Sequence, residues 1–132
     1  MKTPLLLTAI YLACIVQQAV EDSSGLIGRW SNPGKTVVMR IGPCGDALCG
    51  EVEWASAEAT ADAKRGTKEL VGPELLHSLR RSPTGFWTGS VFVPDLNIRR
   101  EARVQLISPD QIRVSGCLWK RVICKSQYWN RL

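Results

Sequence analysis

The chain has 132 residues, of which 45% are hydrophobic and 22% charged, and its formal net charge is +5. This length predicts one globular domain and excludes a two-domain enzyme. In chain order, residues 1–19 have the pattern of a secretory signal peptide, a positive start followed by an apolar run too short to span a bilayer. We expect export, a single domain over residues 20–132, and no transmembrane segment after cleavage. Lipoprotein anchoring through Cys14 is the competing interpretation.

The mature chain reads as short strands separated by turns. Its alternating apolar and polar residues, bounded by Pro, Gly, Asn and Asp, are typical of half-buried antiparallel strands. Between them, residues 56–64 predict a short helix, and residues 73–80, where leucines recur at helical spacing, predict another. About eight strands suffice to close a barrel. The predicted fold is therefore an all-β antiparallel meander barrel with a short helical insertion around residues 56–80. We expect strands at residues 28–30, 36–41, 48–55, 86–93, 98–107, 112–118 and 122–131.

The four cysteines outside the apolar N-terminal run predict two local disulfides. Cys44 and Cys49 bracket one turn-like segment, and Cys117 and Cys124 bracket another. An even number of cysteines in a short exported chain is typical of disulfides, and hairpin connections favour Cys44–Cys49 and Cys117–Cys124. A long-range pairing and a four-cysteine zinc site are the alternatives. The spacings differ from the usual zinc knuckles, so we expect no metal site and no cofactor.

Three residues at the two ends of the domain carry a resemblance to lipocalin-like barrels. Such barrels have a Gly-x-Trp on the first strand and an Arg of the last strand over the Trp; here these are Gly28, Trp30 and Arg131. The segment Cys44-Gly-Asp-Ala-Leu-Cys49-Gly and the ending Cys124-Lys-Ser-Gln-Tyr-Trp-Asn-Arg131 resemble the bacterial family called domain of unknown function 2147. The resemblance implies a small exported bacterial protein with a calycin-type barrel and no assigned activity.

The inward strand faces point to a binding function. Apolar side chains at alternate positions would line a barrel of about eight strands, which has room for one small ligand. We therefore predict non-enzymatic binding of an apolar or amphipathic molecule. A cell-envelope interaction module with a side-chain-filled barrel is the alternative. The candidate cavity-lining residues are Val37, Met39, Val52, Trp54, Val104, Leu106, Ile112 and Val114.

For three other features, a structural explanation competes with a catalytic or binding role. The single histidine, His77, falls on the predicted second helix with no nucleophile and acid placed beside it, so we expect no catalysis. Glu51 and Glu53 alternate with inward residues and read as a solvated outer face. A basic cluster that includes Arg99, Arg100 and Arg103 favours an anionic envelope surface or plain solubility. Export argues against nucleic acid as its partner.

Overall fold

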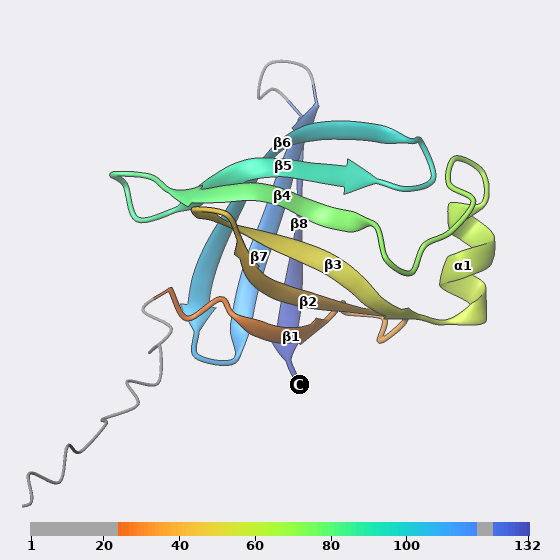
Figure 1. Cartoon of the computed structure of the whole chain (residues 1–132), viewed down its shortest axis with the longest axis horizontal. Helices are drawn as coiled ribbons and strands as arrows, with labels where there is room; N and C mark the ends of the chain where they lie inside the picture. The colour runs from red at the N-terminus through yellow and green to blue at the C-terminus, as the bar shows by residue number, and fades with distance from the viewer. Residues whose placement is uncertain (1–23, 119–122) are drawn as a thin grey trace, which may run out of the picture.

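Eight antiparallel strands follow one another in chain order around a closed barrel (Figure 1). The computed structural model describes residues 24–118 and 123–132; the expected signal peptide and Cys14 lie outside these residues. No helix among the described residues is long and apolar enough to cross a membrane. The elements are β1 (Gly28–Ser31), β2 (Val37–Cys44), β3 (Ala47–Ala55), α1 (Ala57–Ala63), β4 (Glu74–Arg81), β5 (Trp87–Val93), β6 (Ile98–Ser108), β7 (Gln111–Leu118) and β8 (Ile123–Arg131).

The meander predicted from alternation is confirmed, and so are both disulfides. Cys44 is bonded to Cys49 across the β2–β3 hairpin, with Cα atoms 5.7 Å apart. Cys117 is bonded to Cys124, which lies directly opposite it on β8. Two disulfides in a chain of this size indicate an oxidising, extracytoplasmic environment.

The barrel closes where β1 meets β8, and one arginine secures the closure. The β1–β8 pairing is short and places Trp30 opposite Arg131. The Arg131 guanidinium lies 4.3 Å from the centroid of the Trp30 ring, the contact expected from the lipocalin-like motif. The Trp30 indole in turn donates to the carbonyl of Leu26 at 2.8 Å. Gly28 has a φ of 144°, and a Cβ there would lie 2.5 Å from Nη1 of Arg131. Glycine is therefore required for the arginine to reach its place.

The helix predicted over residues 73–80 is wrong, because this segment is strand β4. The register between β4 and β5 shifts around Ser78, whose φ is +54°. A bulge of this kind inserts an extra residue, so that residues three apart face the same side of a strand. Leu76 and Leu79 are both buried for this reason. Their spacing imitates a helical period. The shorter helix expected at residues 56–64 is present as α1, and the Oγ of Ser56 caps its N-terminus by accepting from the Ala59 N–H.

A second bulge turns Trp54 out of the barrel, so its assignment to the barrel interior is also wrong. Val38 lies opposite Trp54 while its neighbour Met39 lies opposite Val52, which leaves Glu53 as the extra residue of β3. Met39 faces inward and is buried. Because alternation restarts after the bulge, Trp54 takes the outer face and is 48% exposed.

The barrel interior is filled at one end and hollow at the other. Around Trp30, side chains pack with almost no exposed surface. The end beside α1 instead contains a cavity. The barrel is therefore neither fully open nor fully filled, since only part of its inward apolar surface packs against other side chains. The most completely buried residues are Leu26, Trp30, Met39, Ile41, Val52, Leu76, Leu79, Val104 and Ile112.

Candidate ligand-binding cavity

A cavity of about 880 Å³ lies at the barrel end covered in part by α1. It is open to solvent on one side, and Figure 1 shows α1 beside that end of the strands. Its wall is formed by residues of β2, β4, β5, β6, β7 and β8 and of the β5–β6 turn. The residues that line it include Val37, Met39, Ala59, Ala63, Leu70, Leu75, Leu76, Val91, Phe92, Val114, Gly116, Gln127 and Trp129.

The floor of the cavity is apolar and is positioned by close packing. Met39, Leu76 and Trp129 line the cavity and are themselves buried. A Cβ on Gly50 of β3 would lie 2.6 Å from the Sδ of Met39. Glycine on β3 therefore lets the methionine lie against the sheet and form part of the floor. The indole Nε1 of Trp129 is buried and has no acceptor among the described residues.

The rim of the cavity is polar and carries both acidic and basic side chains. Glu58, Asp62 and Asp95 supply carboxylates, and Arg100 and Lys125 supply cations. The structure shows no ion pair that joins these five side chains to one another among the described residues. Nη1 of Arg100 donates to the main-chain carbonyl of Arg99 at 3.0 Å. The five charges remain open to a charged or polar group at the opening.

A contact between two loops fixes the shape of this rim. The hydroxyl of Thr67, in the segment after α1, donates to the carbonyl of Pro94 in the β5–β6 turn at 2.7 Å. A Cβ on the neighbouring Gly66 would lie only 2.6 Å from the same carbonyl oxygen. The two loops therefore approach at main-chain distance, which a larger residue at position 66 would prevent.

The eight residues predicted to line a cavity have three different fates. Val37, Met39 and Val114 line it. Val52, Val104 and Ile112 face inward but belong to the filled core. Trp54 lies on the outer face. Leu106 pairs with the buried Ile112 but belongs neither to the cavity nor to the filled core.

Trp54 and Leu106 lie outside the cavity for different structural reasons. The β3 bulge turned Trp54 outward, whereas Leu106 lies near the opposite end of β6 and is 39% exposed. There it packs over Gly25, where a Cβ would lie 2.7 Å from Cδ2 of Leu106. Sequence reasoning missed Leu75 and Leu76, because it put them on a helix, and Trp129. An alternation count that allowed a bulge at Ser78 would have placed Leu76 on the inward face together with Leu79. Leu75 lies at a second register shift, where β4 pairs with β3.

The charged residues on the outer wall are engaged in surface contacts. Glu53 accepts from Nε of Arg29 at 2.6 Å and lies 3.6 Å from Arg40. The hydrogen bond from Arg29 holds the pKa of Glu53 below its ordinary value. These contacts agree with an outer face for this carboxylate. In the basic cluster, the Arg99 guanidinium lies 5.3 Å from the centroid of the Phe92 ring.

Comparison with known proteins identifies a family but no characterised relative. A family model described as "Uncharacterized protein conserved in bacteria (DUF2147)" matches residues 28–131. The match runs from the first residue of β1 to the last residue of β8. Searches of curated proteins and of solved structures gave no match.

Proposed function

We propose, from the premise that the chain belongs to the DUF2147 family of bacterial proteins, that it is an exported carrier of one small apolar or amphipathic ligand. The observation that carries the proposal is the cavity of about 880 Å³ with an apolar floor and a charged rim. Pockets of roughly 300–1,000 Å³ with apolar walls and a few polar groups are typical of small-molecule sites. The ligand's apolar part lies against Met39 and Trp129, and its polar end reaches the rim.

The expected affinity follows from the area that such a ligand buries. Burial of about 300 Å² of apolar surface contributes roughly 7.5 kcal/mol at 25 cal/mol per Å². Immobilising the ligand subtracts from this sum. A micromolar dissociation constant corresponds to about 8 kcal/mol, so contacts at the rim have to supply the difference. On the β6 and β8 side of the rim, Arg100 and Lys125 can pair with a carboxylate or phosphate head group, away from the acidic residues of α1.

Binding without turnover is part of the proposal. Among the described residues, the side chains that line the cavity include no histidine and no cysteine. General acid–base or nucleophilic catalysis commonly relies on such groups, held within hydrogen-bond reach of one another. Export is supported by the two disulfides and by the signal-like pattern of residues 1–19.

Titration with an environment-sensitive fluorescent fatty acid tests the proposal. We expect saturable binding, an increase in probe emission and a change in tryptophan emission from Trp129. Val114→Phe should fill the cavity and abolish binding, whereas Arg113→Phe adds the same ring at the next position of β7, which does not line the cavity. Replacing Arg100 and Lys125 by Gln should weaken the fatty acid more than the matching fatty alcohol. Absence of saturable binding, or binding that Val114→Phe leaves unchanged, contradicts the proposal.

The alternative is an interaction module of the cell envelope, and one observation favours it. Trp54 presents a large aromatic ring on the outer face and is half exposed. Tryptophan is enriched at the energetic centres of protein interfaces. Basic residues such as Arg99 and Arg103 could add attraction to an anionic surface. Under this alternative, Trp54→Ala removes association with envelope material, and Val114→Phe has no effect on it.

A further inference from the structure

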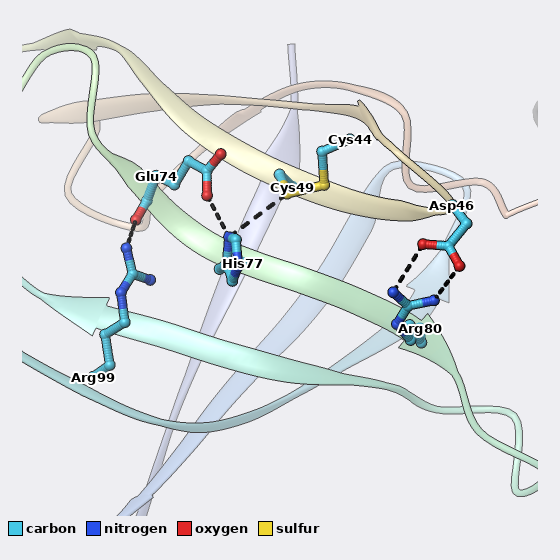
Figure 2. The surroundings of a disulfide bond; sticks show 7 residues. All are labelled: Cys44, Asp46, Cys49, Glu74, His77, Arg80 and Arg99. Carbon is cyan, nitrogen blue, oxygen red and sulfur yellow. Dashed lines mark hydrogen bonds and ion pairs between the residues drawn. A yellow bond between two sulfur atoms is a disulfide. The ribbon is translucent and has the colours of Figure 1, made fainter.

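A group of metal-ligating atoms lies on the outer wall of the barrel, away from the cavity. Figure 2 shows the Cys44–Cys49 disulfide at the end of the β2–β3 hairpin and, beside it, His77 and Glu74 of β4. The Nδ1 of His77 is 4.0 Å from the Sγ of Cys49 and 2.5 Å from Oε2 of Glu74. One ligand atom from each of Cys49, Glu74 and His77 lies within 4.8 Å of the other two. None of the four residues lines the cavity.

The fold assembles this group through irregularities in the strand pairing. Leu48 lies opposite Leu79, but Gly50 lies opposite Leu76, and the register shifts between these pairs. Cys49 is the residue at the shift, and its side chain approaches His77 on the neighbouring strand. The group is therefore a product of β4 being a bulged strand.

The neighbouring arginines do not form ion pairs with the candidate ligand groups. Arg80 pairs with Asp46 at 2.8 Å and not with Glu74. Arg99 donates to the main-chain carbonyl of Glu74 rather than to its carboxylate. The carboxylate of Glu74 is shared with His77, as Figure 2 shows. A bound cation would replace the Glu74–His77 contact, because carboxylate and imidazole groups both ligate metals.

We propose that reduction of the Cys44–Cys49 disulfide opens a site for one zinc-class divalent cation. Its ligands are the two thiolates, Nδ1 of His77 and one carboxylate oxygen of Glu74. Two sulfurs, one imidazole and one carboxylate are ligands that Zn²⁺ accepts in tetrahedral sites. The four-cysteine site considered from the sequence is a different arrangement, since Cys117 and Cys124 take no part here.

Three of the four proposed ligand atoms, those of Cys49, Glu74 and His77, already lie near one another in the oxidised protein. With metal–ligand distances of about 2.0–2.3 Å, ligand atoms in a tetrahedron lie about 3.3–3.8 Å apart. The Nδ1–Sγ distance of 4.0 Å needs little change. The two sulfurs have to separate after reduction, and the Cα separation of 5.7 Å permits this through side-chain rotation. The Glu74 carboxylate withdraws slightly from the imidazole to admit the ion.

The reaction balances with an external dithiol as reductant. The dithiol gives two electrons and two protons to the Cys44–Cys49 bond and becomes a disulfide itself. The two protein thiols then bind M²⁺ as thiolates and release two protons to solvent. In the reverse exchange an external disulfide takes two electrons from the two thiolates and is reduced to a dithiol, the Cys44–Cys49 bond forms again, and the cation is released. Metal binding therefore depends on the redox state of the disulfide, since two sulfurs bonded to each other are not available as thiolate ligands.

Cobalt titration of the purified protein tests this directly. The protein is reduced without oxygen by a phosphine, which is then removed, and Co²⁺ is added to reduced and oxidised samples. We expect one Co²⁺ per reduced chain, with thiolate-to-cobalt charge-transfer absorption and the visible bands of tetrahedral cobalt, both lost on adding Zn²⁺. The oxidised protein should show neither band.

Variants locate the ion and control for the second disulfide. C117S/C124S should keep the cobalt spectrum, and C44S/C49S should lose it. H77A and E74Q should each weaken Co²⁺ binding at least about tenfold, since even outer-sphere changes cost 10–100-fold. Binding retained by C44S/C49S, unchanged affinity in H77A, or no cobalt in the reduced protein overturns the proposal. Loss of the β-sheet circular dichroism spectrum in reduced C117S/C124S also counts against it, because the site needs β3 and β4 in register.

Discussion

Replacing Arg131 by Ala should open the seam of the barrel and destabilise the whole domain. The guanidinium donates to three main-chain carbonyls, those of Pro109 at 2.9 Å, Ile27 at 2.9 Å and Gly25 at 2.6 Å. It also stacks on Trp30. These contacts join both chain ends of the domain at the point where β1 and β8 share little main-chain pairing.

The size of the effect can be estimated from these contacts. Hydrogen bonds from a charged group contribute about 1.5–3 kcal/mol each when well shielded. The Arg131 side chain is only partly buried, so we assign about 1 kcal/mol to each bond. A cation–π contact adds about 1 kcal/mol. The variant should lose about 4 kcal/mol of unfolding free energy, or roughly 15 °C in melting temperature for a domain of this size.

Urea unfolding followed by tryptophan fluorescence measures this loss. Arg113→Ala is the matched control, because the structure shows no hydrogen bond or ion pair of the Arg113 side chain among the described residues, and such surface changes stay within about 0.5 kcal/mol. Arg131→Lys should fall between Arg131→Ala and the wild type, since lysine keeps the charge and loses the planar fork. An Arg131→Ala loss below about 1 kcal/mol, no larger than for the control within error, would show that Arg131 does not secure the β1–β8 closure.

The remaining predictions concern the core and the surface charges. Leu79→Ala, at a fully buried position, should cost about 2–5 kcal/mol in urea unfolding, whereas Leu96→Ala, at a position 60% exposed, should cost less than about 0.5 kcal/mol; equal losses would contradict the core assignment. The hydrogen bond from Arg80 lowers the pKa of Asp46, so this pair stabilises the fold above the ordinary carboxyl pKa and loses its effect as pH falls through the lowered value. Arg80→Ala should raise the Asp46 pKa in a carbon-13 NMR titration, and an unchanged value would rule the pairing out.

Local alternation and turn chemistry were enough to predict most of the fold. Strands near β2, β3, β6 and β7 could be recognised because apolar and polar residues alternate along them. The strand near β5 could be recognised by its aromatic and β-branched residues. Both disulfides followed from their place across hairpins. What alternation does not encode is a bulge, which adds one residue without a sequence signal of its own. The bulges at Glu53 and Ser78 therefore account for the outward Trp54 and for the helix wrongly assigned to β4.

The candidate site was less predictable because a cavity is a property of packing. Inward apolar residues look the same in sequence whether they fill the barrel or line a void. Met39 and Val104 illustrate this, since both are buried while only Met39 borders the cavity. The grouping of His77 with Cys49 was equally hidden, since it depends on the cross-strand register of a bulged strand.

Native mass spectrometry of the protein isolated without detergent from its own cells shows whether the barrel carries a ligand. We expect a one-to-one adduct of a small amphipathic molecule on the wild type. The same adduct should be present on Arg113→Phe and missing from Val114→Phe. Wild-type protein found only at its unliganded mass, or an adduct retained by Val114→Phe, would contradict a ligand-carrying cavity in this barrel.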